Sequence, residues 1–279
     1  MRNKFAFIGV GNMASAIISG ITPGEGALPW DSIVLFDRSP EKMQSFANKG
    51  AIVADSVTHA VELADCVLLC VKPQQFPEVL PLLSLCENVN NKLFITIAAG
   101  IQMSEVSTAT GGAPVIRAMP NTPMLVGKGV CALCRSDNVT DNDYDIAHKL
   151  FSASASVIDI SEHEMNRIIC VTGSSPAYIF LMIKAMYDGA VAQGLLNNSD
   201  SESGLTSEQL INSICDTIIG TAYLMKSKDL TPDEQIKNVA SKGGTTEKAL
   251  AELENYNFYQ AIISAMQECT KRADELSHK

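Results

Sequence analysis

Short apolar runs alternate with stretches of helical periodicity over the first 160 residues. The apolar runs are rich in β-branched residues and are bounded by Gly, Pro, Asp or Asn, which is typical of buried strands. They predict strands at residues 4–9, 32–37, 51–54, 65–71, 93–98, 114–119, 129–134 and 156–160. Runs without polar interruption indicate a parallel sheet that is covered by helices on both faces.

The segments between these runs have the spacing of amphipathic helices. They cover residues 13–21, 40–49, 57–63, 77–83, 103–108 and 143–151. Strands and helices in this order predict an α/β fold with an N-terminal Rossmann-type doubly wound sheet, in which ligands bind beyond the carboxyl ends of the strands.

The strand signal ends near residue 160, and helical patterns take over. Helices are predicted at residues 162–171, 176–196, 206–227, 245–254 and 257–276. We therefore expect a dinucleotide-binding domain over residues 1–160 and an all-α dimerisation and substrate-binding domain over residues 161–279. Residues 178–196 are apolar almost all round, which indicates burial against another subunit. Residues 197–204 form a polar linker between two helices.

Length and charge agree with this division and exclude some functions. At roughly 150 residues per domain, 279 residues suggest two domains. The formal net charge of −10 argues against nucleic-acid binding. The longest uninterrupted apolar run, residues 66–71, is far shorter than the roughly 18 residues that span a bilayer, so we expect a soluble protein without a membrane partner.

The eight cysteines are dispersed, which indicates a reducing, cytoplasmic compartment. Cys131 and Cys134 form a CxxC inside a predicted strand, with no further ligands to complete a metal site, and we expect them to be buried. The first 16 residues imitate a signal peptide, but Gly9, Gly11 and Asn12 interrupt the apolar stretch, so we expect no cleavage there.

A GxGxxA turn, residues 9–14, follows the first predicted strand and opens a helix. Gly9 permits the tight turn, Gly11 lets the backbone approach a pyrophosphate, and the small Ala14 allows the helix to pack on the strand. The phosphate would bind the helix N-terminal amides. The alternative is a purely structural glycine turn, but the acidic Asp37 at the end of the second strand favours a dinucleotide site.

The residues at the end of the second strand leave the cofactor open between NADPH and NADH. Asp37 is placed to accept hydrogen bonds from ribose hydroxyls, which favours NAD. Arg38 and Ser39 follow and can bind a 2′-phosphate, which favours NADP. The alternative for Arg38 and Ser39 alone is that they are solvent-exposed residues at the end of a strand, just before the next helix, and bind no cofactor.

Five further motifs make the pattern specific: VKPQ at 71–74, AAGI at 98–101, RAMPNTP at 117–123, GSSPAY at 173–178 and GGTT at 243–246. Together, over nearly the whole chain, they resemble the pyrroline-5-carboxylate reductase family. The resemblance implies a Rossmann domain followed by a helical domain through which two subunits intertwine, with dimers often assembled into a decameric ring. It also implies reduction of the cyclic imine L-1-pyrroline-5-carboxylate to L-proline, the final step of proline biosynthesis, by an oxidoreductase that acts on CH–NH with NAD(P).

The expected cofactor-binding residues lie in the glycine turn, at the end of the second strand and in the matching motifs. These are Ile8, Gly9, Val10, Gly11, Asn12, Met13, Asp37, Arg38, Ser39, Val71, Lys72, Pro73, Ala98, Ala99 and Gly100. Lys72 is expected to reach the ribose or nicotinamide region, or else to be a solvated lysine. Arg117 is expected to fix the MPNTP turn.

The resemblance places substrate-binding residues at Asn238, Gly243, Gly244 and Thr245, and catalytic residues at Thr246 and Glu162, with part of each site from the neighbouring subunit. The GGTT amides form a nest suited to a carboxylate, although a capped helix start is the alternative.

Two side chains are candidates for the chemistry itself. Thr246 would place its hydroxyl at the imine nitrogen, with catalysis resting on positioning and electrostatics. Glu162 either favours the iminium or caps a helix.

Three positions depart from the family pattern: Ser175 replaces a glycine, Lys242 replaces a proline, and Val57 replaces an asparagine near the adenine side. They leave two alternatives open, a paralogue that reduces a related cyclic imine and a dinucleotide-binding protein without turnover. β-Hydroxyacid dehydrogenases share the glycine turn, but they carry a lysine in their helical domain, and this sequence has none at the corresponding place.

Overall fold

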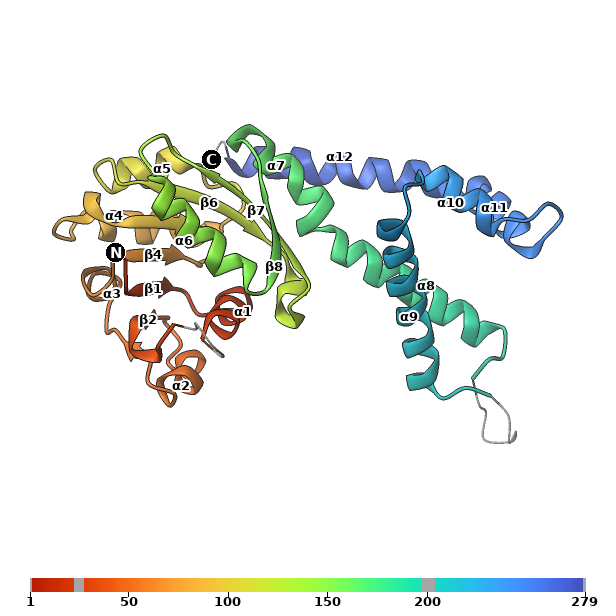
Figure 1. Ribbon diagram of the computed structural model, residues 1–279, viewed down its shortest axis with the longest axis horizontal. Coiled ribbons are helices and arrows are strands. Elements are labelled where there is room, and N and C mark those ends of the chain that lie inside the picture. The colour runs from red at the N-terminus through yellow and green to blue at the C-terminus, as the bar shows by residue number, and fades with distance from the viewer. Residues whose placement is uncertain (1, 23–27, 197–203, 278–279) are drawn as a thin grey trace. The chain divides into compact units, whose positions relative to one another are not determined.

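The computed structural model describes residues 2–22, 28–196 and 204–277 (Figure 1). It divides into two compact units, Met1–Ser174 with Gln267–Lys279, and Ser175–Met266. The boundary expected at residue 160 differs from this division, because residues 161–174 and the end of the last helix belong to the unit that contains the sheet. Most of the linker expected at 197–204 lies outside the described residues.

The first unit is built on one eight-stranded sheet with the order β3-β2-β1-β4-β5-β6-β7-β8. Every strand expected from the apolar runs is present, with small differences at the ends. The strands are β1 (Phe5–Ile8), β2 (Ile33–Phe36), β3 (Ile52–Val53), β4 (Cys66–Leu69), β5 (Leu93–Thr96), β6 (Val115–Pro120), β7 (Gly129–Arg135) and β8 (Ala155–Asp159).

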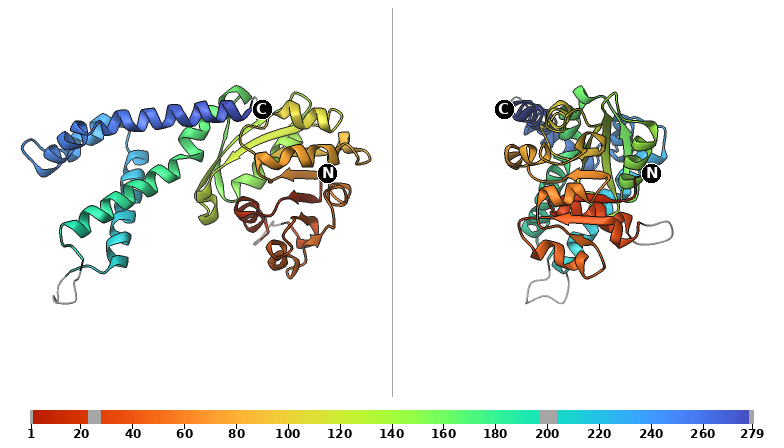
Figure 2. Two further views of the ribbon diagram at one scale, coloured as in Figure 1. Left: turned by 180° about the vertical axis from the view of Figure 1, so that it is seen from behind. Right: turned by 90° about the vertical axis from the view of Figure 1, so that its left-hand side faces the viewer.

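Helices cover both faces of this sheet, and further views in Figure 2 show them on either side of the strands. One face packs against α1 (Asn12–Ile21), α2 (Glu41–Ala47) and α6 (Asp141–Ser152). The other packs against α3 (Val57–Glu62), α4 (Phe76–Leu83) and α5 (Met103–Ala109). The strand order reverses between β1 and β4, so the crevice for a ligand lies beyond the carboxyl ends of these two strands.

One strand pair departs from the expected parallel sheet. β6 and β7 are antiparallel, whereas the other neighbours are parallel. Between them lies only the short 3₁₀ segment Thr122–Val126 with its flanking residues. A parallel crossover needs about a dozen residues or more, so a connection this short forces the chain to turn back.

The second unit is helical. It contains α8 (Ser175–Ala192), α9 (Ser207–Ser227), α10 (Pro232–Val239), α11 (Thr245–Asn255) and the first part of α12 (Phe258–Ser277). Helix α10 was not predicted from the sequence. Its start carried a signal, because Thr231 and Glu234 form a capping box around Pro232 at the first helical position.

Residues Glu162–Ala192 form a continuous helical run in place of the two helices expected there. It passes through 3₁₀ segment Glu162–Glu164, α7 (Met165–Ile168) and the π-helical segment Ile169–Gly173 into α8. The run is long and apolar enough, by length and composition alone, to cross a membrane. Its side chains remain largely uncovered in the single chain, where Phe180 is 67% and Leu181 68% exposed.

Candidate active site

The glycine turn joins the ends of β1, β2 and β4. Gly9 adopts a φ of +92°, and its N–H donates a 2.7 Å hydrogen bond to the carbonyl oxygen of Phe36. A Cβ at Gly9 would lie only 3.0 Å from the backbone nitrogen of Val71. Both the backbone angle and the close packing therefore require glycine here.

The N-terminus of α1 is open toward the crevice. Gly11 is the N-cap residue, no side chain caps the helix, and the first turn contains no acidic residue. A Cβ at Gly11 would meet no atom within 4 Å, so there is free space beside these amides. The unpaired N–H groups and the helix dipole favour an anion at this position, as the sequence predicted for a pyrophosphate.

A cavity of about 380 Å³ extends from this turn. Several residues predicted to bind the cofactor line it: Ile8, Gly9, Gly11, Asp37, Arg38, Ser39, Val71 and Lys72. Val57, which the sequence placed near the adenine side, also lines it. Further lining residues were missed as cofactor contacts: Phe36, Lys42, Cys70, Gln75, Glu78, Val79 and Leu82. Most of these come from α4 and the 3₁₀ segment Pro73–Gln75, and no motif in the sequence marked them.

Other predicted cofactor residues do not line the cavity: Val10, Asn12, Met13, Pro73, Ala98, Ala99 and Gly100. Asn12 and Met13 begin α1, so their amides remain placed for a phosphate. Gly100 has a φ of +81°, and a Cβ there would lie 2.9 Å from the Cβ of Leu276 on α12. Its glycine is explained by this packing of the C-terminal helix.

Asp37 is occupied by its own chain. One carboxylate oxygen accepts a 2.8 Å hydrogen bond from the Val10 N–H, and the other accepts a 2.9 Å bond from the Ser39 N–H. Lys42 Nζ lies 3.2 Å away. Burial raises the pKa of the Asp37 carboxyl, but the bonds from Ser39, Val10 and Lys42 outweigh it, and the pKa lies below its usual value. The carboxylate therefore ties the glycine turn to the end of β2.

Arg38 extends to the other side of the cavity. Its guanidinium forms an ion pair with the Glu78 carboxylate, in the first turn of α4. Both side chains are exposed, at 62% and 61%, so solvent screens the pair and its contribution to stability is small. Arg38 and Glu78 thus bring both signs of charge to the lining of the cavity.

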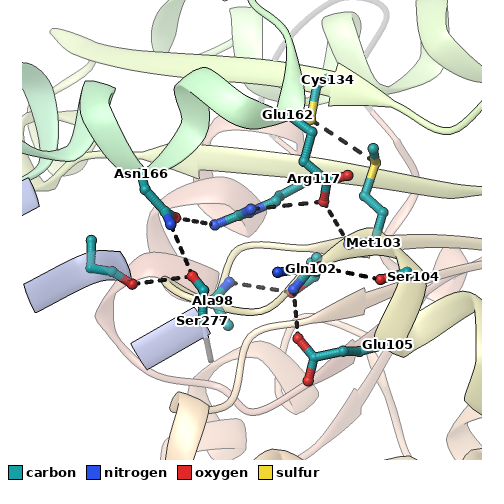
Figure 3. A network of polar contacts seen from close by, with 12 residues as sticks. Ala98, Gln102, Met103, Ser104, Glu105, Arg117, Cys134, Glu162, Asn166 and Ser277 are labelled. Carbon is teal, nitrogen blue, oxygen red and sulfur yellow. Dashed lines mark hydrogen bonds and ion pairs between the residues drawn. The ribbon is translucent and has the colours of Figure 1, made fainter. Parts of the chain in front are cut away.

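Glu162 lies in a polar network with Met103, Arg117 and Asn166 (Figure 3). Its carboxylate accepts a 2.7 Å hydrogen bond from the N–H of Met103, the first residue of α5. It also lies 3.8 Å from the guanidinium of Arg117, which is only 2% exposed. Burial lowers the pKa of Arg117, and the nearby Glu162 opposes this effect. Within this chain, Glu162 caps α5 and balances a buried cation.

Arg117 does not hold the MPNTP turn, contrary to the expectation. Its guanidinium donates a 2.8 Å hydrogen bond to Asn166 Oδ1, and Asn166 in turn donates to Asp274 and Ser277 on α12. The buried Asn121 fixes the turn instead: it donates to the Thr172 carbonyl at 3.0 Å and accepts from the Val130 N–H at 2.8 Å. An amide can do both, because it carries a donor and an acceptor.

The GGTT loop lies in the helical unit and begins α11. The loop is a helix start, as the alternative interpretation predicted, but Gly244 is the N-cap residue and no side-chain hydroxyl caps the helix. Gly243 has a φ of +74°, and its N–H donates to the Glu247 carboxylate. The turn therefore already receives a carboxylate from its own chain. Thr245 and Thr246 form the first turn of α11, and Asn238 belongs to the neighbouring helix α10.

A dinucleotide fits the first unit on its geometry alone. The uncapped α1 suits a pyrophosphate, the polar residues after β2 suit a ribose with or without a 2′-phosphate, and the apolar Val57, Val79 and Leu82 suit an adenine ring. The sheet order, the glycine turn and the cavity define a protein with a Rossmann-type dinucleotide-binding domain.

Comparison with known proteins narrows this class. Residues 162–276 match the family model "Pyrroline-5-carboxylate reductase dimerisation". Residues 4–100 match the model "NADP oxidoreductase coenzyme F420-dependent". The pyrroline-5-carboxylate reductase of Haemophilus influenzae is 36% identical over 99% of this chain and 98% of its own length. That of Escherichia coli is 32% identical over 99% of both chains.

Solved structures agree. A pyrroline-5-carboxylate reductase from Coxiella burnetii superposes with a TM-score of 0.82 and 30% identity, covering 99% of this chain and 98% of its own. The enzyme from Streptococcus pyogenes gives a TM-score of 0.84 and 28% identity, covering 98% of both. The chain belongs to the pyrroline-5-carboxylate reductase family. Its fold class and the resemblance in its motifs are confirmed, and its helical region is a dimerisation domain, which explains the exposed apolar face of α8.

Proposed function

We propose that this protein reduces L-1-pyrroline-5-carboxylate to L-proline with NADPH or NADH, as the final step of proline biosynthesis. The observation that carries the proposal is that this member of the family has two turns whose backbone amides can bind an anion. The α1 N-terminus has no side-chain cap, and the Gly243 amide binds a carboxylate, that of Glu247.

The dinucleotide would be held by the α1 amides, the cavity wall at Arg38, Ser39 and Lys72, and the turn at Gly9. When bound, it supplies the hydride. The residues of this chain would orient the reactants, which is where most of the rate enhancement of such a reaction arises.

On the substrate side, the Gly243 amide would bind the carboxylate of the imine, displacing Glu247. The Gly244 amide donates a 2.9 Å hydrogen bond to the Ser241 carbonyl and would keep the turn in place. Thr246, at the second position of α11, would direct its hydroxyl to the ring nitrogen. The hydride adds to the carbon of the protonated C=N bond, the π electron pair passes to nitrogen, and the nitrogen keeps its proton in the amine product. No strong acid is required, because the iminium is already protonated.

Glu162 fits the capping role better than a role beside the iminium. Its carboxylate is already engaged by the Met103 N–H and the Arg117 guanidinium. We therefore assign Glu162 to positioning of α5 and retain Thr246 as the catalytic candidate.

We also propose that the chain functions as a cytoplasmic homodimer, with part of each site from the partner subunit, and that dimers assemble into decamers. The support is the dimerisation region at residues 162–276 and the exposed apolar side chains of α8. Light scattering on the purified protein measures both states directly, and a molar mass of one chain at micromolar concentration would contradict the dimer.

The direct test follows the oxidation of NADPH and NADH in parallel with pyrroline-5-carboxylate as substrate, and proline is identified as the product. We expect turnover with at least one of the two cofactors. A six-membered cyclic imine carboxylate serves as the competing substrate, since Ser175 and Lys242 depart from the family pattern near the site. Turnover of the six-membered imine alone would assign a paralogous activity, and turnover of neither imine would reject the proposal.

A further inference from the structure

The cavity wall at Arg38 contains an acidic residue that no motif marked. Glu78 projects from the first turn of α4 and lines the same cavity as Arg38, Ser39 and Lys42. It forms an ion pair with Arg38, the residue that would receive a 2′-phosphate. The position that distinguishes NADPH from NADH is therefore shared by a cation and an anion.

The usual carboxylate for this position already has partners in its own chain. Both oxygens of Asp37 accept backbone hydrogen bonds, from Val10 and from Ser39, and Lys42 lies beside them. Asp37 and Lys42 both line the cavity and form an ion pair, so their charges largely neutralise each other. Lys72 also lines the cavity, but it follows β4, so the charge balance beside Ser39 depends chiefly on the Arg38–Glu78 pair.

We infer that Glu78 is a specificity-determining residue, which weakens the binding of a 2′-phosphorylated dinucleotide relative to the unphosphorylated one. This inference rests on the proposed use of a nicotinamide dinucleotide. A 2′-phosphate carries up to two negative charges, so it must take the Arg38 guanidinium away from Glu78 and tolerate the Glu78 carboxylate nearby. A free 2′-hydroxyl meets neither cost, and it can donate a hydrogen bond to the carboxylate.

The expected change in dinucleotide affinity depends on how exposed the Arg38–Glu78 pair is. Solvent and salt screen charges that are more than half exposed, so a single carboxylate changes affinity only modestly. We expect Glu78→Gln, which keeps the shape and removes the charge, to tighten NADP⁺ binding roughly threefold to tenfold. NAD⁺ binding should change less than twofold, and the gain for NADP⁺ should shrink as salt is raised.

The test measures equilibrium dissociation constants of NADP⁺ and NAD⁺ by calorimetry on the full chain, without substrate. Glu87→Gln is the matched control, because Glu87 is an exposed glutamate just after α4 that does not line the cavity. A higher NADP⁺ to NAD⁺ affinity ratio in Glu78→Gln alone supports the inference. An unchanged ratio, a weaker NADP⁺ affinity, or the same gain in Glu87→Gln overturns it.

The same titrations separate this inference from the proposed function. If the wild-type protein binds both dinucleotides and reduces the imine, yet the ratio does not respond to Glu78→Gln, only the role of Glu78 is rejected. If the wild-type protein binds neither dinucleotide, the proposed function falls, and the role of Glu78 falls with it.

Discussion

The Glu162 carboxylate joins the start of the helical region to two elements of the sheet domain: it accepts the Met103 N–H at 2.7 Å and lies 3.8 Å from the Arg117 guanidinium. Arg117 Nε is buried with no hydrogen-bond partner among the described residues. A buried cation is costly unless it is balanced, so Glu162 contributes to stability through Arg117 as well as through α5.

Glu162→Ala should therefore lower the free energy of unfolding by about 2 kcal/mol, measured by urea denaturation. Glu162→Gln keeps an acceptor for the Met103 N–H, so its free energy of unfolding should fall by less than that of Glu162→Ala. Glu87→Ala, at an exposed position, should change stability by less than about 0.5 kcal/mol. If Glu162 acted only on the iminium, both Glu162 variants would keep wild-type stability and lose turnover.

A second charged contact makes stability depend on pH. Arg2 binds both oxygens of Asp143, at 2.6 and 2.9 Å, and Asp143 is buried. The Arg2 hydrogen bond lowers the pKa of Asp143 below its usual value of 3.8, although burial opposes it. The ion pair therefore stabilises the folded protein fully above about pH 4. This stabilisation is lost as the pH falls through the lowered pKa, because the Asp143 carboxyl takes up its proton at a higher pH in the unfolded chain than in the folded one.

Asp143→Asn should cost about 2 kcal/mol of unfolding free energy near neutral pH, since Arg2 loses its counter-ion. The difference between wild type and variant should narrow as the pH falls below 4. Equilibrium unfolding between pH 3 and 7 measures it, and a constant difference across that range would show that the ion pair does not contribute.

Gly100→Ala tests the packing of the C-terminal helix. The new Cβ would strain a backbone with a φ of +81° and would lie 2.9 Å from Leu276 Cβ. Gly111→Ala is a matched control, because Gly111 has a φ of +64° and no atom within 4 Å of an added Cβ. Both variants should lose about 1 kcal/mol from strain, and Gly100→Ala about 1–3 kcal/mol more from overpacking. Equal losses in thermal unfolding would show that Leu276 moves aside.

Thr246→Ala should reduce kcat/KM for imine reduction roughly tenfold to a hundredfold, if Thr246 orients the ring nitrogen. Dissociation constants for NADPH and NADH should change less than twofold, because the dinucleotide cavity lies in the other unit. Thr246→Ser, which keeps the hydroxyl, should recover most of the activity. An equal loss of dinucleotide affinity would assign Thr246 a structural role.

Leu181→Asp should disrupt the dimer, because it places a charge on the exposed apolar face of α8. Light scattering should show a lower molar mass or a dissociation constant raised at least tenfold. Leu85→Asp is the control: Leu85 is 71% exposed but follows α4 in the sheet domain. A dimer that survives Leu181→Asp unchanged would place the interface on other side chains.

Much of the first domain follows from local sequence. Each strand is a short apolar run, and side chains along such a run lose water on both faces of the sheet, so sequence and burial coincide. The antiparallel β6–β7 pair was missed because apolar runs carry no direction, although the short link at Thr122–Val126 contained the signal. Helix α10 was missed because it is short and polar overall, with Ile236 and Val239 as its large apolar side chains, while its capping box was readable.

The residues of the candidate site likewise fall into some that the sequence predicted and others that it did not. Gly9 and Gly11 were readable because only glycine tolerates their backbone angle or leaves space for a ligand. Glu78, Lys42 and Leu82 were not, since they enter the cavity from helices that carry no phosphate-binding motif. Asp37 remains predicted as a ribose acceptor, but the hydrogen bonds that it accepts from the Val10 and Ser39 amides depend on the fold and were not predicted.

The sequence by itself determined the strand and helix order, the phosphate-binding turn and the family, because these depend on residue types at fixed local spacing. Only the tertiary structure decided which partner each polar side chain takes. Arg117 and Glu162 are 45 positions apart by their numbering, and Arg38 and Glu78 are 40 apart. Such contacts form when distant segments of the chain pack together, so the local pattern of residue types does not predict them.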